Sequence, residues 1–225
     1  MGQHPGTQLQ PPRGLLLDAM GTLIGLRASV GSTYASLAAD HGVAVEASAI
    51  DRVFPAIYRA APPLAFPGLS GAALLEAEQQ WWISRIAEAF AACGHPEPLP
   101  EALGPELFAR FARPDLWRVY PDVDGQLRQW KQRGLQLAVV SNFDQRLLGL
   151  LEGLALADLF SAVVVSSAVG AAKPDPRPFH CALEALALAP AEAWHVGDSP
   201  EDEAGARAAG VRCVLIRRPG PAGAA

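Results

Sequence analysis

The stretch Leu15-Leu16-Leu17-Asp18-Ala19-Met20-Gly21-Thr22-Leu23 decides how the rest of the chain is interpreted. Three consecutive leucines are typical of a short strand buried inside a parallel sheet. Asp18 would then lie at the carboxyl end of that strand, where open α/β sheets hold their ligand sites. Gly21 would allow a sharp backbone turn beside it. A plain turn that begins at an Asp explains these residues equally well, so the choice depends on the remaining sequence.

After residue 120, hydrophobic runs of strand length alternate with helical patterns. Strands are predicted at 135–140, 162–165, 194–197 and 211–216, with helices at 122–133, 144–154, 176–188 and 200–209. Repeated strand–helix units of this kind form a parallel sheet with helices on both faces. Between residues 30 and 113 the pattern is helical throughout. Its longest helix is predicted at 71–92, where one face carries Leu75, Trp82, Ile83, Ile86 and Phe90. Trp81 and Trp82 point roughly 100° apart on this helix, so one of them facing something other than the helix core is an alternative, but both are expected to pack.

The helical block interrupts the strand–helix pattern directly after the first predicted strand. It is therefore interpreted as an insertion over the carboxyl edge of the sheet. The predicted fold class is α/β, with a Rossmann-like three-layer parallel-sheet core at 13–28 and 115–218 and an all-helical cap at 29–114. The polar, Pro-rich segment 1–12 and the tail 219–225 are predicted to be flexible ends.

Composition restricts the class of partner. The 225 residues carry a net charge of -5 and no run of Lys or Arg, so neither nucleic acid nor an anionic membrane is a predicted partner. No apolar segment reaches membrane-spanning length. The three cysteines, at 93, 181 and 213, lie far apart without metal-type spacing, which indicates reduced thiols and a cytoplasmic protein. No sequence feature predicts a particular oligomeric state.

Four polar clusters follow predicted strands. They are Asp18, Ser141 with Asn142, Lys173 in the segment Lys173-Pro174-Asp175-Pro176, and Asp198 with Asp202. Each cluster alone is typical of a turn or of a helix cap. Together, at one edge of a sheet, they would supply a nucleophilic carboxylate, hydroxyl and amide donors, a cation and paired acids. That set is what metal-assisted phosphoryl transfer requires.

These motifs resemble those of the haloacid dehalogenase superfamily, and the resemblance extends from residue 13 to about residue 218, helical cap included. It implies that Asp18 attacks phosphorus and forms an aspartyl-phosphate. Ser141 and Asn142 would then bind the phosphoryl oxygens, and Lys173 would neutralise the phosphate and keep Asp18 ionised.

The resemblance also implies a cofactor, Mg²⁺, which prefers oxygen ligands. Asp18, Asp198 and the backbone carbonyl of Met20 would bind it directly. Asp202 would assist through water or by orienting Lys173.

Met20 departs from the family pattern, because phosphatases of this superfamily carry a second Asp there. That Asp protonates the leaving oxygen and later activates water, and a thioether does neither. We therefore expect a Mg²⁺-dependent, phosphatase-like hydrolase of a small phosphorylated metabolite that favours good leaving groups. Two alternatives remain open: a catalytically degenerate binding protein, and a dehalogenase-type displacement at carbon by Asp18, in which Arg27 would meet an anionic substrate.

Overall fold

The computed structural model describes residues 11–95 and 98–218. Apart from Pro11 and Pro12, the predicted flexible ends 1–12 and 219–225 lie outside the described residues. In chain order the elements are β1 (Gly14–Leu17), β2 (Ile24–Leu26), α1 (Val30–Asp40), α2 (Ala47–Ala60), α3 (Gly71–Ala92), α4 (Leu103–Arg110), β3 (Trp117–Val119), α5 (Val123–Gln132), β4 (Gln136–Ser141), α6 (Arg146–Gly153), β5 (Ala162–Val165), α7 (Ser166–Val169), α8 (Arg177–Leu186), β6 (Ala193–Gly197), α9 (Pro200–Ala208) and β7 (Arg212–Leu215).

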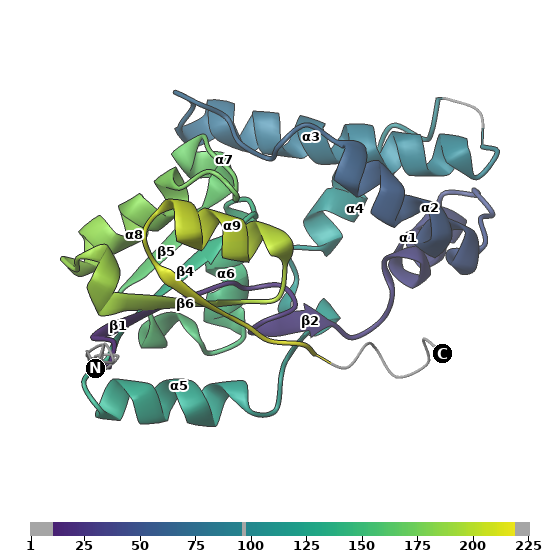
Figure 1. Ribbon diagram of the computed structural model, residues 1–225. Helices are drawn as coiled ribbons and strands as arrows, with labels where there is room; N and C mark the ends of the chain where they lie inside the picture. Colours follow the sequence, from purple (N-terminus) through teal and green to yellow (C-terminus); the bar gives the residue numbers. More distant parts are fainter. Residues whose placement is uncertain (1–10, 96–97, 219–225) are drawn as a thin grey trace, which may run out of the picture.

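The predicted α/β class is confirmed by a five-stranded parallel sheet in the order β5-β4-β1-β6-β7 (Figure 1). The strand formed by the three leucines lies at its centre, because β1 pairs with β4 on one side and β6 on the other. Leu16 stands opposite Ala138 and His195 in these two pairings. The carboxyl ends of β1, β4 and β6 therefore meet at one edge.

Alternate side chains of β1 enter two different hydrophobic cores. Leu15 and Leu17 pack with residues of α5 and α6, whereas Leu16 packs with residues of α8 and α9. This follows from the period of two along a strand, which sends successive side chains to opposite faces. Figure 1 shows the resulting layers, with α5 on one side of the sheet and α8 and α9 on the other.

Helices α1 to α4 form a separate helical group with its own core, built around Tyr34, Ile50 and Phe90. The chain reaches this group through β2 and returns through β3, and these two strands pair with each other antiparallel. Strands β2 and β3 were not predicted, because three residues are too few to show a period. The predicted division into a cap at 29–114 and a core on either side of it stays a prediction.

Helix α3 has the predicted bounds, and Ile86 and Phe90 of the predicted face are buried, but the N-terminal part of that face differs. Leu75 was expected on the buried face and is 49% exposed, whereas Leu74 and Glu78 are buried. The charged Glu78 is tolerated there because its carboxylate accepts hydrogen bonds from the backbone and the side chain of Gln145. A hydrophobic pattern does not reveal a buried carboxylate with partners, so the predicted face was wrong at Leu75 and did not include Glu78.

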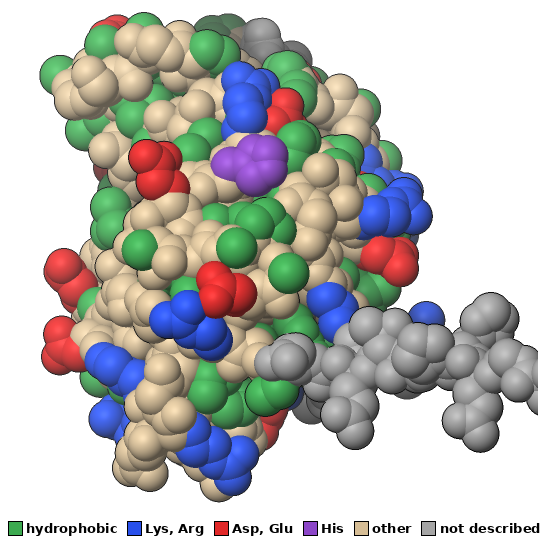
Figure 2. Space-filling model, turned by 60° about the vertical axis from the view of Figure 1, so that its left-hand side comes forward, with side chains coloured by type: hydrophobic (Ala, Val, Ile, Leu, Met, Phe, Trp, Pro, Cys, Tyr) green, Lys and Arg blue, Asp and Glu red, His purple; other side chains and the backbone are tan. Residues whose placement is uncertain are grey.

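Among the described residues, no helix is both long enough and apolar enough to cross a membrane. On the face drawn in Figure 2, basic and acidic side chains are interspersed with hydrophobic ones. The absence of a nucleic-acid partner stays a prediction from the charge pattern.

Candidate active site

Asp18 lies at the centre of the site because it directly follows the central strand β1. It is 5% exposed, and its Oδ1 atom accepts a hydrogen bond from Ser141 Oγ at 3.1 Å. The same oxygen accepts from Lys173 Nζ at 2.6 Å. Within residues 11–95 and 98–218, no donor reaches Oδ2 of Asp18. One carboxylate oxygen is therefore held in place, and the other is left for a reaction partner.

Lys173 connects two acidic side chains inside the site. Its ammonium group contacts Asp18 and Asp202, each at 2.6 Å, and donates to the carbonyl of Val140 at 3.1 Å. Burial disfavours a charged lysine, but the two carboxylates outweigh that effect and raise the pKa of Lys173 above its ordinary value. Lys173 therefore carries a positive charge beside Asp18 at neutral pH.

Asn142 uses most of its amide group to contact the backbone of Lys173. Its Oδ1 accepts from the backbone N–H of Lys173 at 2.7 Å, and its Nδ2 donates to the Lys173 carbonyl at 3.0 Å. This double contact ties the loop before α8 to the end of β4. One N–H of the amide is left for a ligand, so Asn142 both positions Lys173 and lines the site.

Asp202 is fully occupied by protein donors. Its oxygens accept from Lys173 Nζ, His195 Nε2, the backbone N–H groups of Asp198 and Ser199, and Ser199 Oγ. Burial opposes ionisation of Asp202, but the His195 hydrogen bond and the Lys173 charge outweigh it and hold its pKa well below the ordinary range. Asp202 thus stays ionised and fixes the ammonium group of Lys173.

The acidic residues of the site fit a divalent cation. Asp18, Asp198 and Asp202 each offer an oxygen, and these oxygens lie within 4.8 Å of one another. Burial, and then the charges of Asp18 and Asp202, raise the pKa of Asp198 to about 6, which indicates negative charge that is incompletely compensated. Carboxylate oxygens are the ligands that Mg²⁺ prefers. Because Asp202 already accepts five hydrogen bonds, Asp18 and Asp198 are the better direct ligands.

Gly21 allows the loop after Asp18 to approach Asp198. Its φ angle is +82°, and a Cβ atom built there would lie 2.2 Å from Asp198 Oδ2. Any side chain at this position would therefore displace the carboxylate. The glycine of the opening motif is needed for the acidic cluster as well as for the turn.

Met20, the residue that departs from the family pattern, is 43% exposed and its side chain borders a cavity. Arg27 does not line this cavity. Its Nε atom instead donates to the carbonyl of Trp117 at 2.8 Å. The contact with an anionic substrate considered for Arg27 therefore has no support in the geometry.

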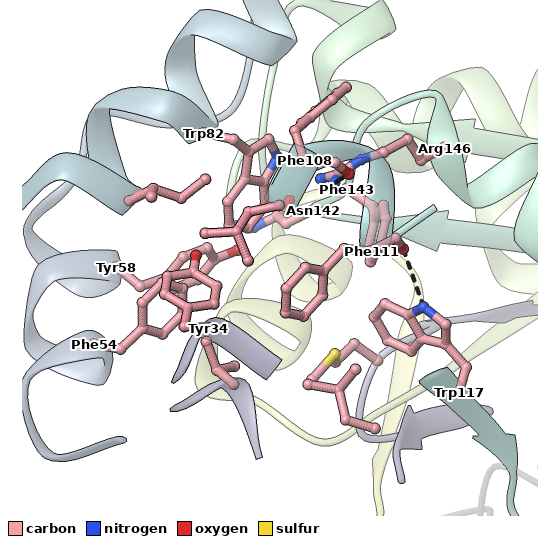
Figure 3. Close-up of a pocket in the computed structure, with 15 residues that line it drawn as sticks. Tyr34, Phe54, Tyr58, Trp82, Phe108, Phe111, Trp117, Asn142, Phe143 and Arg146 are labelled. Atoms are coloured by element: carbon pink, nitrogen blue, oxygen red, sulfur yellow. Dashed lines mark hydrogen bonds between the residues drawn. The ribbon is translucent and has the colours of Figure 1, made fainter. Parts of the chain in front are cut away.

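The cavity, which we call the aromatic cavity, has a volume of about 220 Å³ and lies between the helical group and the carboxyl edge of the sheet. Figure 3 shows aromatic rings from both parts of the chain around it. Its aromatic lining residues are Tyr34, Phe54, Tyr58, Trp82, Phe108, Phe111, Trp117 and Phe143. Its other lining residues are Met20, Leu26, Val30, Ile86, Leu107, Asn142 and Arg146.

Arg146 is the charged residue of the aromatic cavity, and it is neutralised by Asp144. Its guanidinium donates to both carboxylate oxygens of Asp144, at 2.8 and 2.7 Å, and to the carbonyl of Phe108 at 2.8 Å. Its Cζ atom lies 4.0 Å from the ring centroid of Phe108. Trp82 Nε1 also donates to Asp144, at 2.7 Å, so the expectation that both tryptophans only pack was wrong for Trp82.

Tyr58 lines the aromatic cavity and also lies within the electrostatic influence of Asp18 at the edge of the sheet. Desolvation and then the charges of Asp18 and Asp144 raise the pKa of its phenol. Its ring stacks on that of Trp82, with centroids 6.0 Å apart. Neither Tyr58 nor Phe54 was among the residues predicted to line a site. Their spacing of four residues on one helix is the signal that could have indicated a shared aromatic face.

A parallel α/β sheet with this acidic cluster at its carboxyl edge and helices inserted after the first strand defines a class of hydrolase. The model of the haloacid dehalogenase-like hydrolase family matches residues 12–210, and the chain belongs to this family. The predicted resemblance is thereby confirmed.

The chain is also similar to individual proteins of this family. Haloacid dehalogenase-like hydrolase domain-containing protein 3 of Bos taurus is 40% identical over 212 residues, which cover 93% of this chain and 83% of the relative. A phosphoserine phosphatase of Thermus thermophilus is 38% identical over 178 residues, 72% of each chain. The solved structure of an L-2-haloacid dehalogenase from Xanthobacter autotrophicus superimposes with a TM-score of 0.67 at 22% identity, covering 91% of this chain and 77% of that one. At that identity the structural match shows the fold alone.

Proposed function

We propose that this chain is a Mg²⁺-dependent hydrolase that removes the phosphoryl group from a small phosphorylated molecule. The observation that carries the proposal is the state of the Asp18 carboxylate. Ser141 and Lys173 hold its Oδ1, and its Oδ2 receives no hydrogen bond from the described residues. A carboxylate fixed by one oxygen is suited to attack through the other. The similarity to a protein named phosphoserine phosphatase supports phosphorylated small molecules as the substrate class.

The proposed reaction has two displacements at phosphorus. In the first, Oδ2 of Asp18 forms a bond to phosphorus while the bond to the leaving oxygen breaks. Lys173 and Ser141 interact with the negative oxygens of the group in transfer. In the second, water attacks phosphorus, the bond to Asp18 breaks, and inorganic phosphate leaves as the carboxylate is restored. The residues 29–114 would act as the cap that encloses the substrate.

The metal site in this proposal consists of Asp18, Asp198 and the backbone carbonyl of Met20. Bound there, Mg²⁺ would supply positive charge that neutralises the phosphoryl group and the cluster of carboxylates. Asp202 acts on Lys173 rather than on the substrate, because its oxygens already accept hydrogen bonds from Lys173, His195 and Ser199. We therefore assign Asp202 as a positioning residue.

Met20 limits which esters the site would hydrolyse. Because a thioether cannot donate a proton, the leaving oxygen must take one from water or leave as an anion. Acyl and aryl phosphates, whose leaving groups are stable anions, would react faster than alkyl phosphates. The same residue favours the second candidate function, a family member that binds its ligand without turnover. Displacement at carbon by Asp18 would differ from the proposed hydrolysis of phosphate esters in needing no metal.

A screen of acyl, aryl and alkyl phosphates, with and without Mg²⁺, tests the proposal. We expect Mg²⁺-dependent release of inorganic phosphate from the first two classes, and loss of that release in Asp18→Asn, which keeps the shape of the side chain but not the nucleophile. Asp18→Asn that retains most of the wild-type rate would show that another group attacks. No turnover of any ester by folded protein would favour the binding function.

A further inference from the structure

The aromatic cavity adjoins the catalytic edge through two of its lining residues. Asn142 follows Ser141, whose hydroxyl contacts Asp18, and Met20 comes two residues after Asp18. A phosphoryl group at Asp18 would therefore direct the rest of its molecule along the exposed side chain of Met20. Met20, which cannot act as an acid, therefore supplies an apolar wall.

The polar groups that line the aromatic cavity are few: the phenol hydroxyls of Tyr34 and Tyr58, the amide of Asn142 and the guanidinium of Arg146. The charge of Arg146 is neutralised by Asp144, and three of its N–H groups already donate to Asp144 and Phe108. Asn142 uses its Oδ1 and one N–H on the backbone of Lys173, which leaves one N–H. A ligand hydroxyl buried without a partner loses about 1–3 kcal/mol relative to water. Each such hydroxyl would weaken binding about five- to 150-fold.

The volume of the aromatic cavity suits one ring. Apolar protein cavities of about 150 Å³ stay dry and bind benzene. At about 220 Å³, this cavity holds a ring of that size with a few further methylene groups. The rings of its wall hold one another in place, since Tyr34 and Phe54 meet edge to face at a centroid distance of 5.8 Å and Tyr34 and Phe111 do so at 5.9 Å. Flat apolar groups pack well against such rings.

We infer that the aromatic cavity binds the apolar part of the substrate, so that the substrate class is a phosphate ester or acyl phosphate carrying a single aromatic ring or a compact hydrocarbon group. This inference rests on the proposed function, since it places the phosphoryl group at Asp18. It ranks polyhydroxylated substrates such as sugar phosphates as poorer ligands, because the lining has few polar groups and most of their hydroxyl groups would meet apolar walls.

Binding of two phosphonates that are not hydrolysed tests the inference. Benzylphosphonate and methylphosphonate share the phosphonate group and differ by the ring, so calorimetric titration of each with Mg²⁺ present isolates the contribution of the ring. We expect benzylphosphonate to bind at least about tenfold more tightly, since a single methylene in an apolar pocket already contributes about 10- to 200-fold.

Two variants and a control locate the effect. Phe54→Ala removes a ring from the wall, and Val30→Phe fills part of the volume. In both we expect the preference for benzylphosphonate to fall to about threefold or less while methylphosphonate affinity is kept. Leu75→Ala, on an exposed part of α3 outside the cavity, is the matched control and should keep the preference.

The outcomes separate this inference from the proposed function. Equal affinity for the two phosphonates in the wild type, or an undiminished preference in folded Val30→Phe, would overturn the inference even if esters are hydrolysed. A ring preference that both variants abolish, in a protein that hydrolyses no ester, would support the inference and overturn the proposed hydrolysis.

Discussion

Replacing Lys173 with Met would leave Asp18 and Asp202 buried without the ammonium group that contacts both. The lysine side chain is 3% exposed, and those of Asp18 and Asp202 are 8% and 1% exposed, so water cannot take its place. Removing one partner of a buried ion pair costs about 3–5 kcal/mol. In a chain of this size each kcal/mol lowers the melting temperature by about 2–4 °C, so we expect a decrease of about 6–20 °C.

Thermal unfolding followed by circular dichroism at pH 7, without Mg²⁺, measures this decrease. Lys131→Met is the matched control, because Lys131 is exposed and is the only other lysine of the sequence.

The direction in which this loss of stability depends on pH can be predicted. The pKa of Asp202 is lowered on folding, so its stabilising contribution is present above the ordinary Asp pKa of about 4 and is lost as the pH falls. The difference in melting temperature between wild type and Lys173→Met should therefore become smaller at acidic pH. A melting temperature within about 2 °C of wild type at pH 7 would refute the reasoning.

Three further changes test other parts of the site and fold. Asp198→Ala should weaken Mg²⁺ binding at least about tenfold in calorimetric titration, because it removes a direct ligand; unchanged affinity in folded protein would remove Asp198 from the ligand set. Met20→Asp should raise alkyl-phosphate hydrolysis more than aryl-phosphate hydrolysis, since a positioned general acid contributes about 10²- to 10⁴-fold. A folded variant that binds beryllofluoride but gains on no ester would count against the missing acid. Glu78→Gln should become more stable relative to wild type as the pH rises, because desolvation raises the pKa of Glu78 and the fold then favours its protonated form. Melting curves of both proteins from pH 4 to 8 would measure this, and a constant difference would contradict it.

The fold and the family were predicted from sequence because their signals are local. The strand formed by the leucines at 15–17, the alternation after residue 120 and the four polar clusters can each be recognised without knowing what lies nearby in space. The predicted strand at 135–140 is observed as β4, one residue later, and the predicted helix at 71–92 is observed with those bounds. The roles assigned to individual site residues stay predictions, although the clusters do converge at one sheet edge.

The parts that were not predicted depend on contacts between distant segments. The pairing of β2 with β3 joins strands of three residues each from either end of the helical group. Arg146 and Asp144 are ordinary charged residues in the sequence, and only the approach of Trp82 and Phe108 places Arg146 in the cavity wall with Asp144 as its partner. The burial of Glu78 on α3 has the same origin, because its carboxylate is held by contact with Gln145.

The central position of β1 has a consequence for the order of folding. Its residues leave the ribosome before those of its partner strands, which begin only at Gln136 and Ala193. Parallel pairing across such separations incurs loop-closure entropy before any hydrogen bond forms, which slows folding. The helical group can condense meanwhile, because α1 to α4 contact one another in sequence order. The three leucines that later fill the middle of the sheet therefore remain exposed longest during synthesis, and they are the segment that a chaperone or a growing aggregate would meet first.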